Sequence, residues 1–243
     1  MKLSEYNYIL DGNDHEMHFR LAPSSDLAVI NQIFQQQVYS LEGWPHKAIL
    51  EQYLDRYFQN QSPLIIDAGA NMGASSIYFC NTWKNSFVIS LEPEKYNFSL
   101  LKLNTVGKSV LPLEGAIGSE MGTLYLSDPG HGDVGFRVAQ SGEYEVPVYS
   151  VNHIIDIGRK SNAKPFICKI DIEGGESELF SQNTEWVSDF ALIIIELHDW
   201  MLPMQGSSQS FLKTISQFDF ELLHKGENLF FFNKKLLTQI QQN

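Results

Sequence analysis

The regular alternation of short apolar runs with helix-like segments, which begins at Pro63, most constrains the fold of this chain. Such alternation is typical of a doubly wound, mostly parallel α/β sheet with helices on both faces. The expected strands are Leu64–Ala68, Phe87–Leu91, Val110–Ile117, Phe166–Ile172 and Ala191–Leu197. The expected helices run from about Gly73 to Trp83, from Pro93 to about Leu103, and through Phe211–Phe218. Phe220–His224 and Asn228–Asn233 predict a closing antiparallel hairpin.

Residues 1–60 do not follow this alternation, and we expect them to form an N-terminal cap or flanking segment beside an α/β domain of residues 61–243. Tyr6–Leu10 and Met17–Leu21 predict a hairpin. Helix-spaced apolar residues then continue to Phe58. What this segment covers does not follow from the sequence.

A longer connecting segment separates the third and fourth expected strands. Thr123–Leu126 and Val146–Tyr149 are expected to be extended, and the Gly-rich loop Ser127–Glu143 lies between them. Within this loop, His131 and Asp133 either contact an acceptor or simply belong to a flexible turn.

The net charge of −12, from 17 Lys and Arg against 29 Asp and Glu, argues against a nucleic-acid substrate, because polyphosphate binding depends on clustered cations. No stretch approaches the roughly 20 apolar residues that a membrane-spanning helix needs. The N-terminal residues lack the continuous apolar core of a signal peptide. We therefore expect no membrane span and a cytoplasmic location.

The motif Asp67–Gly73 (DAGANMG) closes the first expected strand and opens a helix, as a nucleotide-binding loop does. Gly69 permits a tight turn, Gly73 permits close packing of the helix, and the helix start directs backbone N–H groups at the ligand. Glu92, at the end of the second strand, can accept hydrogen bonds from both hydroxyls of an adenosine ribose. Ala116, at the end of the third strand, is expected to border an adenine.

Two ligands compete for this loop. A nicotinamide dinucleotide usually comes with G-x-G-x-x-G, whereas Asn71 here stands in a D-x-G-x-N-x-G pattern. Asp67 would oppose a pyrophosphate but suits the ammonium group of a methionine moiety. The pattern therefore favours S-adenosylmethionine, bound by Asp67, Gly69, Asn71, Gly73 and Glu92, with Asp171 nearby.

Polar side chains also end the fourth and fifth expected strands. Lys169, Asp171 and Glu173 alternate, so they share one face if the strand stays extended. Glu196 and His198 follow an apolar run and also share a face. The first and fourth strands of a doubly wound sheet flank the switch point where ligands bind. The side chains expected to converge there are Asp67, Asp171, Glu173, Glu196 and His198.

Each of these residues also has a purely structural interpretation. Lys169 is as readily a structural partner of Asp171 or Glu173 as a functional residue. Glu173 is a candidate cap for the following helix. His198 is as readily an ordinary strand-end histidine as a catalytic group, and Asp199 is a candidate turn residue.

The DAGANMG loop, Leu91–Pro93 (LEP) with Asn97 and Asn104 in the next helix, and Lys169–Gly174 (KIDIEG) together resemble the FkbM-family methyltransferases. The resemblance covers roughly Pro63 to Asp199, and K-x-D-x-E-G is its most specific element. It implies a Rossmann-like class I methyltransferase. The expected reaction is methylation, dependent on S-adenosylmethionine, of a hydroxyl oxygen on a sugar, glycan or glycosylated small molecule.

The resemblance also bears on metal binding. Related sugar O-methyltransferases place divalent-cation ligands at the ends of these two strands, so Asp171, Glu196 and His198, with Glu173, are expected ligands for Mg²⁺ or Mn²⁺. A metal-free site with Asp171, Glu173 and His198 as catalytic residues, and His198 or a carboxylate as base, is equally consistent.

Two other function classes stay open. A nicotinamide-dependent oxidoreductase would bind a dinucleotide in preference to S-adenosylmethionine. A non-catalytic nucleoside-binding module would keep the glycine loop but lose the polar strand ends. Four residues argue against that class: Lys169, Asp171, Glu173 and His198.

Overall fold

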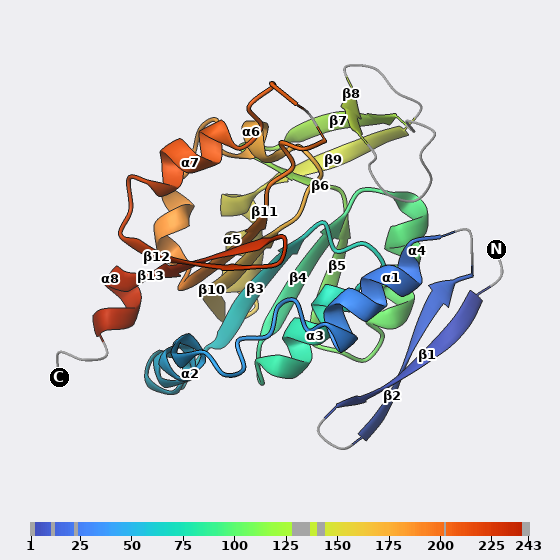
Figure 1. Ribbon diagram of the computed structural model, residues 1–243, viewed down its shortest axis with the longest axis horizontal. Coiled ribbons are helices and arrows are strands. Elements are labelled where there is room, and N and C mark those ends of the chain that lie inside the picture. Colours follow the sequence, from blue (N-terminus) through green and yellow to red (C-terminus); the bar gives the residue numbers. More distant parts are fainter. Residues whose placement is uncertain are drawn as a thin grey trace.

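The computed structural model describes residues 3–10, 13–21, 24–127, 137–139, 144–201 and 203–239. At its centre lies a seven-stranded sheet in the order β12-β13-β11-β10-β3-β4-β5 (Figure 1). Its strands are β3 (Ser62–Ala68), β4 (Phe87–Glu92), β5 (Val110–Glu114), β10 (Ala163–Ile170), β11 (Leu192–Glu196), β12 (Phe220–Lys225) and β13 (Asn228–Asn233). The five strands from β5 to β11 pair in parallel, whereas β13 is antiparallel to both of its neighbours. The predicted doubly wound sheet with a closing C-terminal hairpin is confirmed.

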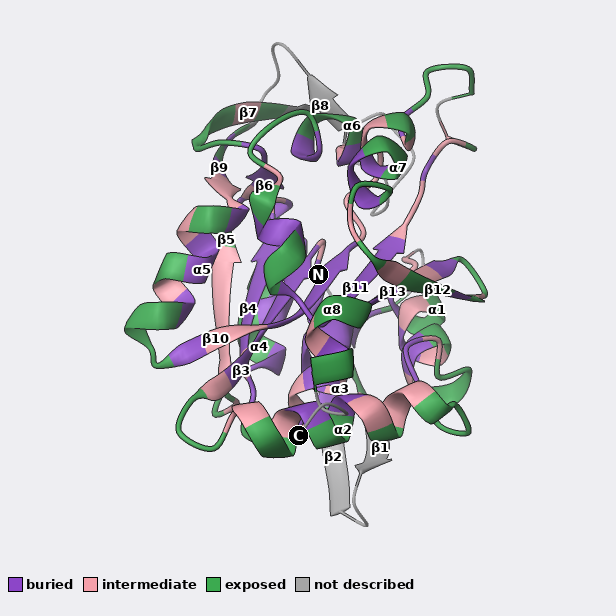
Figure 2. Ribbon diagram, turned by 90° about the vertical axis from the view of Figure 1, so that its left-hand side faces the viewer, coloured by how far each residue is buried: buried purple, intermediate pink, exposed green. Residues whose placement is uncertain are grey.

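The apolar runs form strands because both faces of the sheet are buried, as Figure 2 shows for its central strands. Neighbouring residues of one strand face opposite layers. Thus Ile65 belongs to one hydrophobic core, and Leu64 and Ile66 belong to the other. In β11, Ile194 and Ile193 divide in the same way.

Helices cover both faces. One face is covered by α3 (Ala74–Thr82), α4 (Lys95–Asn104) and the N-terminal segment, and the other by α5 (Val151–Lys160), α6 (Glu176–Leu179), the 3₁₀ turn η2 (Glu185–Asp189) and α7 (Gln209–Ile215). The short helix α8 (Lys234–Leu237) follows the closing hairpin. Among the described residues, no helix has the length and apolarity needed to cross a membrane.

The chain reverses its direction of winding between β3 and β10. It first adds β4 and β5 on one side of β3, and it later adds β10 and β11 on the other side. In the register of β3 and β10, Asp67 pairs with Lys169 and Ala68 with Ile170. The polar residues after both strands therefore emerge at the same edge of the sheet, as predicted for a switch point.

The third predicted strand, Val110–Ile117, is in fact two strands. Gly115, with φ of +154°, separates β5 from β6 (Ala116–Gly118), and a Cβ atom there would lie only 2.6 Å from the carbonyl oxygen of Pro147. A second sheet has the order β6-β9-β7-β8, with β7 (Gly122–Ser127), β8 (Arg137–Ala139) and β9 (Tyr144–Ser150). The two predicted extended segments are its antiparallel pair, β7 and β9. His131 and Asp133 lie outside the described residues.

The N-terminal segment begins with the predicted hairpin, β1 (Leu3–Leu10) and β2 (Asn13–Arg20). It continues as α1 (Asp26–Ile30), the π-helical turn η1 (Asn31–Gln35) and α2 (Pro45–Tyr57). Met17, Ile30, Ile33 and Leu50 belong to the same core as Ile65 of the central sheet. The segment therefore packs directly on one face of that sheet.

Candidate active site

A cavity of about 1670 Å³ opens at the carboxyl ends of the parallel strands. Small-molecule sites are commonly about 300–1,000 Å³, so this cavity has room for a cofactor and a second ligand together. The N-terminal segment, the second sheet and the β12–β13 turn each contribute to its walls, as do the ends of β3, β4, β10 and β11. Residues that represent these elements in chain order are Tyr39, Gly69, Glu92, Ala116, Asp171, His198 and Gly226.

The backbone of the DAGANMG loop explains its residue types. Gly69, Asn71 and Gly73 all have positive φ, of +75°, +49° and +93°, a region that glycine and asparagine enter most readily. A Cβ atom on Gly69 would lie 1.7 Å from the carbonyl oxygen of Asp171, so only glycine fits. A Cβ atom on Gly73 would lie 2.9 Å from a methyl group of Leu101, so Gly73 lets α3 and α4 approach closely.

Glu92 lies at the wall of the cavity, with only 5% of its surface exposed. The backbone N–H groups of Asn71 and Glu94 donate to its two carboxylate oxygens, at 2.8 and 2.9 Å, and the Asn97 amide donates at 3.4 Å. Burial outweighs these hydrogen bonds and raises the pKa of Glu92 to about 7. Oε2 accepts one of these hydrogen bonds and has a further lone pair for a ligand hydroxyl, whereas Oε1 would accept from a ligand in place of the long contact with Asn97.

Asp67 lies beneath the glycine loop and does not line the cavity. The hydroxyl groups of Ser75 and Ser76 donate to its Oδ2 at 2.7 and 2.6 Å, and Lys169 Nζ lies 3.2 Å from its Oδ1. Lys169 Nζ also donates to the carbonyl oxygen of Gly69 at 2.7 Å. Burial lowers the pKa of Lys169, but the nearby Asp67 charge outweighs burial and raises it. The pair thus ties the loop to β10.

Of the two pairings that the sequence left open for Lys169, the structure has the one with Asp171, whose Oδ2 lies 3.5 Å from its Nζ. The pairing with Asp67 was not predicted. The predicted common face of Lys169, Asp171 and Glu173 is wrong beyond Asp171. The strand β10 ends at Ile170, and Glu173 has a φ of +55° in the turn that follows. The helix α6 begins after Gly175 without a side-chain cap, so Glu173 does not cap it.

Glu173 nevertheless lines the cavity. Burial, and next the neighbouring Asp171 charge, raise the pKa of its carboxyl group above the usual value. Ala116 lines the cavity as well. Of the residues predicted to bind a cofactor, those in the cavity wall are Gly69, Asn71, Glu92, Ala116 and Asp171.

His198 is the centre of an acidic cluster at the other end of the cavity. Its Nδ1 lies 2.7 Å from Oε1 of Glu176, and its Nε2 lies 3.5 Å from both Asp171 Oδ1 and Glu196 Oε1. His198 is 2% exposed and Glu176 is fully buried. Ligand-type atoms of Asp171, Glu196 and His198 all lie within 4.8 Å of one another.

The three carboxylates decide the protonation of His198. Burial alone would lower its pKa, but hydrogen bonds to Glu176 and Glu196 and the Asp171 charge raise it to about 10. At neutral pH the side chain is therefore an imidazolium that donates from both nitrogens, and it has no lone pair with which to accept a proton. The predicted convergence of Asp171, Glu196 and His198 is present in the structure.

Two residues of this site were not among the predicted ones. Glu176 lies two residues after the K-x-D-x-E-G motif, and its position at a helix start was the available signal. Tyr39 comes from the N-terminal segment, is 8% exposed and lines the cavity. Burial raises the pKa of Tyr39 well above its usual value, so its hydroxyl stays protonated. Nothing in the local sequence pattern places Tyr39 beside β10.

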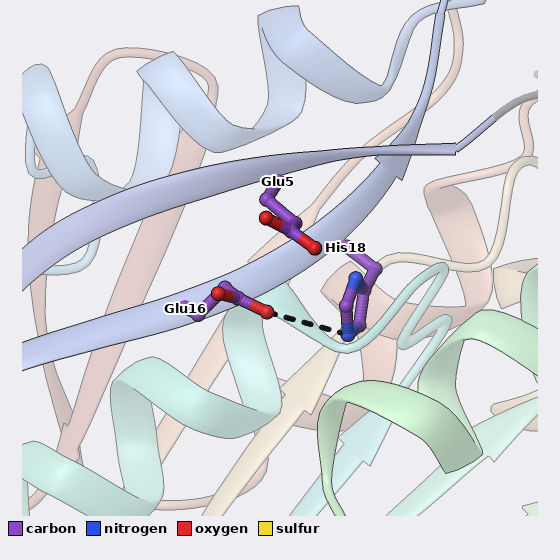
Figure 3. Close-up of side chains that lie close together, drawn as sticks. All are labelled: Glu5, Glu16 and His18. Carbon is purple, nitrogen blue, oxygen red and sulfur yellow. Dashed lines mark ion pairs between the residues drawn. The ribbon is translucent and has the colours of Figure 1, made fainter.

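A second group of ligand-type side chains, Glu5, Glu16 and His18, lies on the β1–β2 hairpin (Figure 3). His18 Nε2 is 3.7 Å from Oε1 of Glu16. Both glutamates are exposed, and exposed acidic side chains of this kind are common on protein surfaces. The group supports no functional assignment.

Comparison with known proteins gives a family match over the region that builds the cavity. The family model described as the methyltransferase FkbM domain matches residues 67–224. A similar curated protein is the hexuronic acid methyltransferase AglP of Haloferax volcanii, 22% identical over 139 residues, which are 57% of this chain and 57% of that protein. The chain therefore matches little more than half the length of this relative.

Two solved structures are also similar. The methyltransferase FkbM from Methylobacillus flagellatus KT is 17% identical, with a TM-score of 0.48, over 74% of this chain and 47% of that one. The fibrillarin pre-rRNA processing protein of Methanococcus jannaschii is 10% identical, with a TM-score of 0.45, over 94% of this chain and 83% of that one. Similarities at this level carry no functional information.

Proposed function

The chain belongs to the FkbM methyltransferase family, and from this premise we propose that it transfers a methyl group from S-adenosylmethionine to a hydroxyl oxygen of a saccharide or glycosylated small molecule. The observation that most supports the proposal is that one cavity joins Glu92 and the glycine loop to Asp171 and His198. A cofactor at the first end and an acceptor at the second would meet beside Asp171.

The residues at the first end fit S-adenosylmethionine. Gly69 lets the loop pack against the carbonyl oxygen of Asp171, which a Cβ atom would meet at 1.7 Å. The buried Oδ1 of Asn71 has no hydrogen-bond partner among the described residues, so it is available to a ligand. In the proposal, Glu92 accepts the ribose hydroxyls, Ala116 borders the adenine, and Gly69 and Asn71 hold the amino-acid end. Asp67 acts through Lys169, by holding the loop in place.

Bound S-adenosylmethionine supplies an activated methyl group, so the protein has to align the acceptor and remove its proton. We assign proton removal to Asp171, whose side chain is 29% exposed in the cavity wall, between the glycine loop and His198. His198, held by Glu176, orients Asp171 and Glu196. Glu173 borders the same space.

A divalent cation is a second arrangement that this site supports. The ligand atoms of Asp171, Glu196 and His198 lie close enough together to share one ion, and two carboxylates with a neutral imidazole suit Mn²⁺ or Mg²⁺. In this arrangement His198 would release its Nε2 proton when the ion binds. Such an ion would lower the pKa of an acceptor hydroxyl. Treatment with EDTA followed by Mn²⁺ distinguishes the two arrangements, because only the metal-dependent one loses and regains turnover.

The proposal is tested by calorimetry with S-adenosylhomocysteine and by transfer of a labelled methyl group to a saccharide panel. Glu92→Ala should weaken binding by more than about tenfold, because the ribose hydroxyls lose charged acceptors. The matched control is Glu114→Ala, an exposed neighbour on β5 that does not line the cavity, and its affinity should be unchanged.

Variants at the second end separate chemistry from binding. Asp171→Asn and His198→Ala should cut turnover by at least about 100-fold and leave the affinity for S-adenosylhomocysteine nearly intact. Full activity in either variant would remove that residue from the mechanism. Stabilisation by NAD but not by S-adenosylhomocysteine in a thermal-shift assay would favour the oxidoreductase, and cofactor binding with no transfer to any acceptor would favour the binding module.

A further inference from the structure

Trp200 is an exposed aromatic side chain at the rim of the cavity. It follows His198 by two residues, and 73% of its surface is accessible. The centroids of the two rings are 6.5 Å apart. A large apolar side chain exposed at the rim of a cavity is typical of a ligand contact.

The turn that carries Trp200 is held by specific hydrogen bonds. The backbone N–H of Met201 donates to the carbonyl oxygen of His198 at 3.0 Å. Asp199 accepts from the Ser207 hydroxyl at 3.1 Å and from the Ser208 N–H at 3.3 Å. The predicted turn residue Asp199 thus anchors the segment, and the indole projects from a fixed turn.

A second hollow, of about 390 Å³, adjoins the cavity at this point and is lined by Glu196, Leu197, Trp200 and Glu227. Three of these residues, Glu196, Trp200 and Glu227, line the main cavity as well. The hollow therefore continues the acceptor end of the cavity outward, past the indole. Its volume falls in the roughly 300–1,000 Å³ range of small-molecule sites.

The chemistry of this hollow matches a pyranose ring. A sugar has an apolar C–H face, which packs on an aromatic ring, and a rim of hydroxyl groups, which donate to carboxylates. Here Trp200 supplies the ring, and Glu196 and Glu227 supply the acceptors.

The charge of the site restricts the sugar. Lys169 and His198 are the only cationic side chains among the described residues of the cavity lining, and both already face carboxylates, Asp67 and Glu176. A uronate would bring a further negative charge beside Glu196 and Glu227, and like charges at close range repel. A neutral or amino-bearing sugar meets no such repulsion.

Resting on the proposed function, we propose that Trp200, Glu196 and Glu227 form the acceptor subsite and that it takes a neutral or amino sugar ring, stacked on Trp200, in preference to a hexuronate. This preference differs from the hexuronic acid in the name of the Haloferax relative. Trp200 contributes affinity for the acceptor and leaves the cofactor end unchanged.

The test uses the full chain saturated with S-adenosylhomocysteine and three probes: methyl β-D-glucopyranoside, its 2-amino-2-deoxy counterpart and methyl β-D-glucuronopyranoside. Binding is followed by saturation-transfer NMR and calorimetry. We expect the neutral and amino glycosides to bind at least about tenfold more tightly than the glucuronide. Tighter binding of the glucuronide, or no binding of any probe, overturns the proposal.

Variants then locate the subsite. Trp200→Ala should weaken binding of the neutral glycoside about tenfold. Trp200→Phe should largely retain this binding, because the phenyl ring still stacks on the sugar. The control Trp44→Ala removes another exposed tryptophan, 42% accessible and outside the cavity lining, and should change nothing. Unchanged glycoside binding in Trp200→Ala contradicts the assignment.

A second pair of variants tests the charge. Glu227→Gln should reduce the difference in affinity between the neutral glycoside and the glucuronide. The control Glu145→Gln, at an exposed residue of β9, should leave that difference unchanged. If the difference in affinity is unchanged in Glu227→Gln, the Glu227 carboxylate does not discriminate against the glucuronide. The affinity for S-adenosylhomocysteine is measured in each variant as a separate test of the proposed function. If the proposed function is wrong, the wild-type protein will not bind S-adenosylhomocysteine.

Discussion

Replacing Lys169 by Met tests the buried network beneath the glycine loop. Lys169 is 2% exposed and Asp67 is fully buried. Within the described part of the chain, the substitution leaves the Asp67 carboxylate with only Ser75 and Ser76 as donors. It also removes the donor to the carbonyl oxygen of Gly69. Breaking a buried ion pair in this way costs about 3–5 kcal/mol. For a chain of 243 residues, that loss lowers the Tm by roughly 6–20 °C.

The assay is urea unfolding at pH 7, followed by far-ultraviolet circular dichroism. The exposed control Lys95→Met should lose less than about 0.5 kcal/mol. The double variant Asp67→Asn/Lys169→Met should be more stable than Lys169→Met alone, because it buries no unpaired charge. A loss below about 1 kcal/mol in Lys169→Met, or a double variant as unstable as the sum of its single changes, would refute the reasoning.

Three further predictions concern the two ends of the cavity. Gly69→Ala should abolish binding of S-adenosylhomocysteine, because its Cβ atom would meet the Asp171 carbonyl oxygen at 1.7 Å. The control Gly107→Ala, with a similar φ of +72° and open space around it, should bind normally. Equal affinities of the two variants would rule out the steric argument. Glu92 has a pKa of about 7, and its ionised form accepts the ribose hydroxyls, so the affinity for S-adenosylhomocysteine should fall about tenfold per pH unit as the pH drops below 7. Glu92→Gln should make this affinity independent of pH over that range. A pH-independent affinity of the wild-type protein would contradict the prediction. Glu176→Gln should lower the pKa of His198 from about 10, as an NMR titration of its ring protons would show; no change would mean that Glu176 does not set it.

The central sheet was predictable because its strands are buried on both faces, so each appears as an uninterrupted apolar run such as Ile193–Ile195. The ends of strands were less predictable, because an apolar run does not reveal where backbone pairing stops. Gly115 breaks the third run for close packing against Pro147, and β10 ends at Ile170 although Ile172 continues the pattern.

The site was predictable where its residues end neighbouring parallel strands and unpredictable where it depends on side chains from other segments. The convergence of Asp171, Glu196 and His198 follows from parallel strands that end at one edge. The burial of Asp67 depends instead on Ser75 and on Lys169 of another strand. The division of the chain into an N-terminal segment and an α/β domain remains a prediction.

The account depends centrally on a nucleoside bound between Glu92 and the glycine loop. The most direct measurement is a crystal structure of the protein with S-adenosylhomocysteine. The account predicts that both ribose hydroxyls donate to the Glu92 carboxylate, with the amino-acid end beside Gly69 and the sulfur facing Asp171. A ligand seated elsewhere, or ribose hydroxyls that make no contact with Glu92, would contradict it.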